Sequence, residues 1–178
     1  MTCIVGFTDG TSVTVGGDSA GVGGYDLTVR ADEKVFELGE FVFGFTTSFR
    51  MGQLLRYNFT PPKFHEGQEI FSYMVTSFIE ALRPVLRNGG FAKVNNGVEE
   101  GGTFLVGVRG KLFRIDNDFQ VGQSVEPFEA VGCGAQIALG AMFASELAAE
   151  QRILRALQAA ERFSAGVRGP FVVKRIPT

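Results

Sequence analysis

Apolar residues at the start of the chain follow the pattern of two β-hairpins. The first would join residues 3–7 to residues 12–19 through Asp9-Gly10, and the second would join residues 33–38 to residues 40–46 through Gly39-Glu40. Asp-Gly between β-rich runs is a strong hairpin signal, because glycine readily takes the positive φ angle of a tight turn. The first strand therefore starts within the first three residues, where most domains have loosely held chain.

Farther along, the pattern predicts helices between further strands. A broad apolar face at helical spacing is formed by Ile70, Phe71, Met74, Val75, Phe78, Ile79 and Leu82. Residues 135–163, rich in alanine, leucine and glutamate, predict a second helical region with a break near residues 147–150. Between these regions lie a polar, glycine-rich loop at 87–102 and β patterns at 103–116 and 129–134, and residues 170–176 predict a last strand. This order predicts a single α+β domain over residues 1–178, with its sheets covered by helices.

Composition narrows the function classes. Of the 178 residues, 45% are hydrophobic and 20% are charged, and the net charge of −2 gives no reason to expect a nucleic acid or membrane partner. No apolar stretch approaches the roughly 20 residues that cross a bilayer, and no signal peptide is apparent. Two cysteines, Cys3 and Cys133, make no disulfide framework, so we expect a cytoplasmic protein. One histidine, His65, excludes metal sites built on several imidazoles.

Thr2, Asp18 and Lys34 are the residues that could carry chemistry. A threonine hydroxyl needs a base to become a nucleophile, and an N-terminal threonine brings its own base in the free α-amine, whose unperturbed pKa is about 8. A neighbouring lysine would favour the neutral amine, and an aspartate would hold that lysine charged. Taken singly, each residue has an ordinary structural explanation: a strand threonine, a turn aspartate and a surface lysine.

The combination of motifs is more specific than any single residue. The motifs are Thr2, GGDSAG at 16–21, DEKVFEL at 32–38, VFGF at 42–45, VGCGA at 131–135 and ERFSAG at 161–166. In this order, and with Asp18 and Lys34 at 16 and 32 residues after Thr2, the chain resembles proteasome β-subunits and the related HslV peptidases over nearly its whole length. These proteins belong to the N-terminal-nucleophile (Ntn) hydrolases.

The resemblance implies a fold and a set of roles. The fold is a four-layer αββα sandwich of two stacked, mostly antiparallel sheets flanked by helices. Thr2 would be the nucleophile once Met1 is removed, its amine would be the general base, and Asp18 and Lys34 would be the supporting charges. Gly44 falls where the family has a glycine whose N–H helps to form the oxyanion hole.

The resemblance indicates three further catalytic positions, and at two of them this chain has a different residue from the family. Cys133 stands where the family has a serine between two glycines, and a thiol is a weaker hydrogen-bonding group than a hydroxyl. Glu161 and Ser164 stand where the family has an aspartate three residues before a serine. Ordinary alternatives are a small buried cysteine and an acid on a helix surface. Cys3 would need to lose both Met1 and Thr2 to act as a nucleophile, so we interpret it as a core residue.

Alignment with the family also indicates walls of a substrate site. These positions are Asp32, Phe36, Val42 and Thr46. They would form a mixed acidic and apolar pocket, and this composition does not identify a substrate.

We therefore expect a threonine-type peptidase that needs no cofactor and works inside a self-compartmentalising homo-oligomeric ring. Its substrate would be a peptide or an unfolded protein, with an ATP-dependent unfoldase as a candidate partner. The sequence shows no long propeptide, so maturation would remove Met1 alone. Two alternatives stay open: an Ntn amidohydrolase acting on small amides, and a catalytically silent structural subunit with the same fold.

Overall fold

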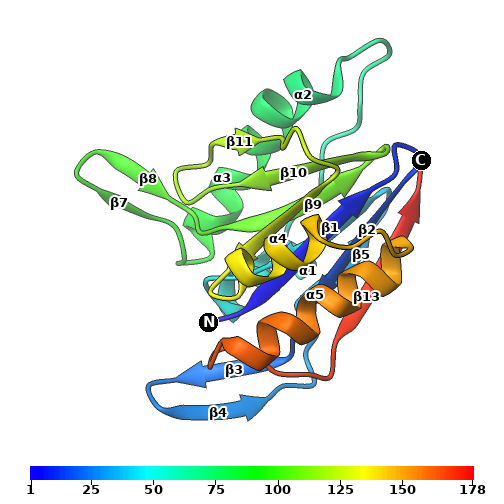
Figure 1. The fold of residues 1–178 in the computed structure, drawn as a ribbon. Coiled ribbons are helices and arrows are strands. Elements are labelled where there is room, and N and C mark those ends of the chain that lie inside the picture. Colours follow the sequence, from blue (N-terminus) through cyan, green and yellow to red (C-terminus); the bar gives the residue numbers. More distant parts are fainter.

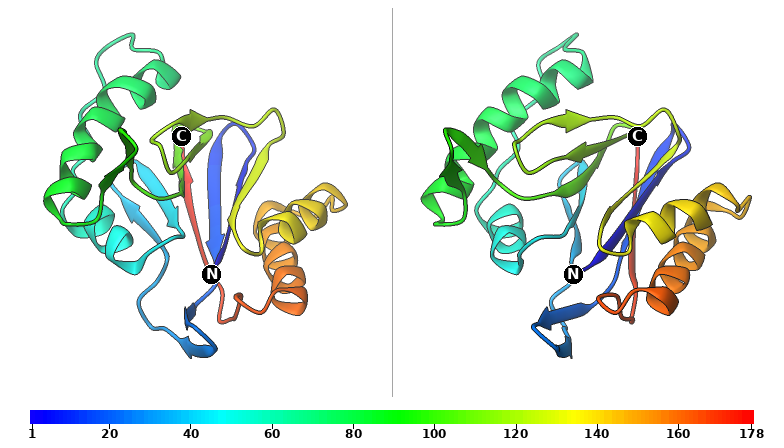
Figure 2. Two further views of the ribbon diagram at one scale, coloured as in Figure 1. Left: turned by 90° about the vertical axis from the view of Figure 1, so that its left-hand side faces the viewer. Right: turned by 60° about the vertical axis from the view of Figure 1, so that its left-hand side comes forward.

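Two antiparallel sheets stacked face to face form the centre of the protein (Figures 1 and 2). The computed structural model describes residues 1–178. The first sheet has the order β12-β1-β2-β13, with bounds β1 Cys3–Thr8, β2 Ser12–Gly17, β12 Phe128–Gly132 and β13 Val172–Pro177. The second has the order β11-β10-β9-β6-β5, with bounds β5 Val35–Leu38, β6 Phe41–Phe45, β9 Phe104–Val108, β10 Lys111–Ile115 and β11 Val121–Gly122.

Helices cover the outer face of each sheet, which completes an αββα sandwich (Figure 2). On the second sheet lie α1 (Phe49–Tyr57) and one continuous helical segment made of α2 (Ile70–Tyr73), the π-helical turn η1 (Met74–Phe78) and α3 (Ile79–Asn88). On the first sheet lie α4 (Ala135–Phe143) and α5 (Ala149–Phe163). The α+β class and the layer order expected from the sequence are confirmed. None of the helices is both long and apolar enough to span a membrane.

Three apolar clusters correspond to the three interfaces of the sandwich. Many of the phenylalanines lie between the second sheet and its helices, where Phe36 and Phe43 stack with ring centroids 5.2 Å apart. Small residues of α4 and α5 pack on the first sheet. Aliphatic side chains such as Ile4, Val15 and Val42 fill the space between the sheets.

Gly44 lies in this inter-sheet interface. Its Cα pairs with Val35 on one side and with Leu105 on the other, so its N–H is directed at a neighbouring strand. A Cβ at this position would collide with the side chains of Ile4 and Val15. Gly44 therefore allows the sheets to approach, and the expectation that its N–H faces a substrate is corrected.

Most of the predicted elements are present, and the exceptions are exposed. Both N-terminal hairpins, the helix from residue 70, the break between α4 and α5 and the last strand are confirmed. The predicted loop at 87–102 contains a hairpin of β7 (Lys93–Asn95) and β8 (Val98–Glu100). A second hairpin that the sequence did not predict, β3 (Ala20–Gly23) with β4 (Asp26–Val29), projects from the sandwich (Figure 1). Because every residue of β4 is exposed, this strand carries no inside–outside alternation to detect.

The N-terminus and several strand ends meet at one rim of the sandwich. Thr2 precedes β1, Asp18 follows β2 and Cys133 follows β12, and these three strands are adjacent in the first sheet. Lys34 precedes β5 of the second sheet. The rim between the sheets thus collects residues that are far apart in the sequence.

Substitution of Gly44 tests the close approach of the sheets. We expect Gly44→Ala to lower the free energy of unfolding by about 1–3 kcal/mol, because the added methyl group overpacks the interface. The control is Gly140→Ala on α4, where a Cβ meets no atom within 4 Å and a helical alanine adds up to about 1 kcal/mol. Urea unfolding of both variants gives the answer, and an unaltered stability of Gly44→Ala would contradict the packing role.

Candidate active site

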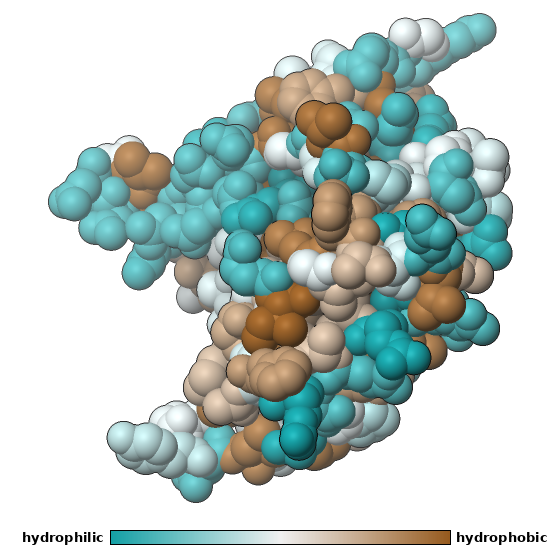
Figure 3. Space-filling view, in the orientation of Figure 1, coloured by the Kyte–Doolittle hydropathy of each residue, from teal (hydrophilic) through white to brown (hydrophobic).

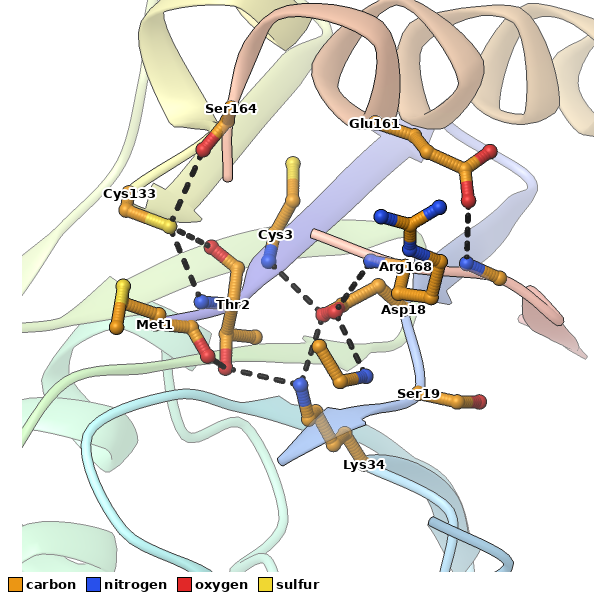
Figure 4. A network of polar contacts seen from close by, with 12 residues as sticks. Met1, Thr2, Cys3, Asp18, Ser19, Lys34, Cys133, Glu161, Ser164 and Arg168 are labelled. Atoms are coloured by element: carbon orange, nitrogen blue, oxygen red, sulfur yellow. Dashed lines mark hydrogen bonds and ion pairs between the residues drawn. The ribbon is translucent and has the colours of Figure 1, made fainter. Parts of the chain in front are cut away.

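A buried chain of hydrogen bonds joins Thr2, Lys34 and Asp18 (Figure 4). The Lys34 ammonium donates to Thr2 Oγ1 at 3.0 Å and to Asp18 Oδ1 at 2.9 Å. The exposed fractions of Thr2, Asp18 and Lys34 are 4%, 1% and 2%, so the group is almost fully removed from solvent. The structure thus brings together the three residues that the sequence spacing singled out.

Backbone donors fix the Asp18 carboxylate. Oδ1 accepts the Cys3 N–H at 3.0 Å, and Oδ2 accepts the N–H groups of Ala20 at 2.9 Å and Arg168 at 3.2 Å. Together with Lys34, these donors satisfy both oxygens from four separate points of the chain. Asp18 therefore has one orientation, and it sets the position of the lysine.

Burial lowers the pKa of Lys34, because removal from water disfavours the charged form. The Asp18 carboxylate opposes this effect by attraction and by its hydrogen bond, but burial is the larger influence. Lys34 accordingly releases its proton more readily than an exposed lysine does. It can hold or accept a proton at Thr2 Oγ1, which lies 3.0 Å away.

Cys133 and Ser164 lie on the other side of Thr2 (Figure 4). The Thr2 N–H donates to Cys133 Sγ at 3.3 Å, and the thiol in turn lies 3.5 Å from the Thr2 carbonyl oxygen and 3.4 Å from Ser164 Oγ. The N–H of Gly134 also donates to the Thr2 carbonyl at 3.3 Å. The structure therefore places Cys133 against the nitrogen that would become the free amine, with Ser164 behind it.

Met1 occupies the entrance to this group. Its carbonyl accepts a hydrogen bond from Thr2 Oγ1, and its side chain lies against Gly166. Met1 is 55% exposed, and the nitrogen of Thr2 is part of the peptide bond to it. In this form the nitrogen cannot act as a base.

Glu161 lies farther from the nucleophile than the sequence comparison suggested. Its carboxylate accepts the Gly169 N–H at 2.8 Å and does not bond to Ser164. The residue before Gly169 is Arg168, which donates its own N–H to Asp18. Glu161 thus anchors a segment that supports the carboxylate.

The predicted substrate positions fall into two groups. Thr46 lines a small cavity together with Thr2 and Lys34, and Asp32 lines a neighbouring cavity. Phe36 is buried in the helix–sheet core and Val42 is buried between the sheets, so neither can reach a substrate. Their assignment as pocket walls is therefore corrected: alternate side chains of a strand point to opposite faces, and here both faces are covered.

Thr47 is a candidate residue that the sequence did not indicate. It lines the cavity with Thr2, and its backbone has a φ angle of 66°, which is rare for a β-branched residue. Its N–H forms no hydrogen bond within the protein, whereas its Oγ1 accepts the Thr103 N–H at 3.1 Å and holds the turn. Glycine would be the expected residue at such an angle, so the residue type gave no signal.

The remaining candidate groups have structural explanations. Cys3 packs among side chains of α4 and α5, and burial raises the pKa of its thiol to about 12, which confirms a core residue. His65 is exposed in the loop before α2. No group of three or more His, Cys, Asp or Glu side chains is placed to hold a metal ion.

The Asp18 carboxylate provides a stability test of this geometry. We expect Asp18→Ala to lower the free energy of unfolding by about 3–5 kcal/mol, because it leaves Lys34 charged and unpaired in the interior. Asp18→Asn keeps one acceptor oxygen and should cost less. Asp26→Ala on the exposed strand β4 is the matched control, expected within about 0.5 kcal/mol of wild type. Wild-type stability of Asp18→Ala in urea unfolding would show that the pair is not formed.

Comparison with known proteins gives matches in structure alone. No protein-family model matches the chain, and no curated protein matches it in sequence. Among solved structures, BPH from Thiobacillus denitrificans, in complex with epoxomicin, has 19% identity and a TM-score of 0.79 over 98% of both chains. HslV from Trypanosoma brucei has 15% identity and a TM-score of 0.70 over 99% of both chains. Anbu (ancestral β-subunit) from Yersinia bercovieri has 17% identity and a TM-score of 0.67, covering 98% of this chain and 81% of its own. The resemblance found in the sequence is thus confirmed at the level of structure: the chain has the proteasome-like Ntn-hydrolase fold of BPH, HslV and Anbu.

Proposed function

We propose that this protein is a threonine-type peptidase in which Thr2, freed by removal of Met1, cleaves peptide bonds. The observation that carries the proposal is the buried contact of Lys34 with both Thr2 Oγ1 and Asp18. A threonine that served only as a strand residue would have no use for a desolvated cation at its hydroxyl. Burial of an ion pair is costly, and functional sites are where such groups are concentrated.

The α-amine of Thr2 and Lys34 can carry out the proton transfers that an acyl-transfer reaction requires. The Thr2 hydroxyl attacks the substrate carbonyl carbon, and its proton passes to the free α-amine, while Lys34 stabilises the oxygen as its proton leaves. Collapse of the tetrahedral intermediate breaks the carbon–nitrogen bond, and the α-amine returns the proton to the leaving amine. Water then attacks the ester on Thr2, and the carboxylic acid product leaves with the hydroxyl restored.

The developing oxyanion needs a donor, and we assign this role to the Thr47 N–H. Thr47 lines the cavity that contains Thr2, and no protein acceptor competes for its N–H. A fixed backbone donor in a water-poor site stabilises the intermediate without reorganisation. Cys133, which touches the Thr2 nitrogen, would orient the amine.

The structural neighbours support the same assignment. BPH is seen in complex with epoxomicin, so a protein of this fold binds that compound. We propose that epoxomicin also binds this chain, at the cavity beside Thr2. The sequence identity to BPH is 19%, so the argument for epoxomicin binding is the geometry of the site beside Thr2.

Replacement of the nucleophile tests the proposed reaction. We expect Thr2→Ala to abolish hydrolysis of an unfolded protein substrate such as casein, because it removes the hydroxyl that Lys34 contacts. The control, Thr28→Ala on the exposed strand β4, should retain wild-type activity. Full activity of Thr2→Ala would refute the assignment.

Two further outcomes separate the alternatives. Hydrolysis of small amides without degradation of casein would indicate an amidohydrolase. Intact mass spectrometry of the purified protein should show a species lighter by one methionine residue. Complete retention of Met1, together with absence of activity, would favour a silent structural subunit.

We also propose that the chain forms a closed homo-oligomer in the cytoplasm. Apolar surface gathers over α4 and α5 (Figure 3), and exposed side chains there and in the connecting loop include Phe143, Leu147 and Phe163. Such patches mark interaction surfaces in soluble proteins.

Both cysteines are free thiols, which suits a reducing compartment. A closed chamber would admit only unfolded chains, which is the reason to expect an ATP-dependent unfoldase as partner.

Charge placed on this surface tests the assembly. We expect Phe143→Asp combined with Phe163→Asp to shift the protein from a large species to a smaller one in sedimentation velocity, because a carboxylate opposes burial. Tyr25→Asp at the tip of the β3–β4 hairpin is the control for an exposed aromatic residue. A wild-type protein that sediments as a monomer would contradict the proposal.

A further inference from the structure

A second cavity adjoins the one that contains Thr2. The two cavities share Phe45 and Phe49, and the second is about 110 Å³ in volume. Its lining includes the rings of Phe45, Phe49 and Tyr57 and the charged residues Asp32, Glu33 and Arg56. A substrate side chain next to the attacked carbonyl can therefore enter this cavity across the ring of Phe49.

The apolar part of the cavity is held in a fixed shape. Phe45 lies against α1 at Gly52, where a Cβ would collide with its ring. The rings of Phe45 and Phe49 meet edge to face with centroids 5.8 Å apart, and the Arg30 guanidinium covers Phe49 at 4.0 Å from its centroid. A preformed cavity of this kind selects a side chain by its size and charge.

Its acidic residues are already paired. Asp32 accepts two hydrogen bonds from Arg30, at 2.6 Å and 2.7 Å, in a bidentate arrangement. Glu33 lies 3.5 Å from the Lys174 ammonium. Both carboxylates of the cavity therefore already have a cationic partner.

Arg56 is the charged residue of the cavity that forms no ion pair. Its guanidinium is half-buried and lies over the rings of Phe36 and Tyr57, at 5.6 Å and 5.5 Å from their centroids. The rings stabilise the cation but leave its hydrogen-bond donors unused. A carboxylate is the group that matches those donors best, since guanidinium binds it through two parallel hydrogen bonds.

From these contacts we infer that the cavity beside the nucleophile receives an acidic side chain of the substrate, and that Arg56 determines this specificity. The inference rests on the proposed peptidase function and names its substrate class. A glutamate or aspartate whose carbonyl is attacked by Thr2 would place its carboxylate against Arg56, with its methylene groups on Phe45 and Phe49.

The test compares fluorogenic tetrapeptides that differ only in the residue before the cleaved bond: Glu, Gln, Leu or Lys. We expect the wild-type protein to have its highest kcat/KM for Glu and its lowest for Lys. Arg56→Gln should lower the ratio of kcat/KM for Glu to that for Leu about tenfold, on the scale of one charge-assisted hydrogen bond. Arg56→Glu should reverse the order of Glu and Lys. Lys63→Gln in the exposed loop before α2 is the matched control and should leave all four values unchanged.

The outcomes separate the two levels of the proposal. A wild-type preference for Lys or Leu, or an unchanged Glu-to-Leu ratio in Arg56→Gln, would overturn the assignment of Arg56 while leaving the peptidase intact. Because the measure is a ratio within one variant, partial misfolding of that variant does not alter it. Hydrolysis of these peptides that survives in Thr2→Ala would instead overturn the proposed function itself.

Discussion

The buried ion pair between Lys34 and Asp18 is the interaction on which the site depends. Removing two charges from water costs several kcal/mol per ion, and only good geometry with further hydrogen bonds offsets that cost. Here the Asp18 carboxylate accepts hydrogen bonds from three backbone N–H groups in addition to the lysine. The Lys34 ammonium donates a further hydrogen bond to Thr2 Oγ1. A hydrophobic pair would stabilise the fold as well or better, so the charges are best explained by the chemistry of the threonine.

The sandwich provides the place for this pair. Strands β1, β2 and β12 of one sheet bring Thr2, Asp18 and Cys133 to one rim, and β5 of the other sheet brings Lys34. The charge cluster therefore spans both sheets, and its geometry depends on how closely they pack. Gly44 in β6 permits that approach. The geometry of the charged groups at the rim therefore depends on the packing between the sheets in the interior.

Local patterns in the sequence predicted most of the strands and helices, but only the family resemblance related the central residues. Thr2, Asp18 and Lys34 flank strands of hairpins, and the order and separation of their motifs match the family, whereas the residues taken alone did not place the three groups together. Phe36, Val42 and Gly44 were assigned wrongly because the face of a strand that meets a partner layer is a property of the whole sandwich. Thr47 was missed because tertiary contacts, and not its residue type, hold its φ angle at 66°. The pairing state of Arg56 likewise became visible only with the neighbouring charges in place.

The most direct test of the central claim is a crystal structure of the purified protein after incubation with epoxomicin. We predict that Met1 is absent, that the compound occupies the cavity beside Thr2 in contact with Thr2 Oγ1, and that Lys34 stays bonded to Asp18. A compound bound away from Thr2 Oγ1, or a site with Met1 in place and no bound compound, would contradict the assignment of Thr2 as the nucleophile.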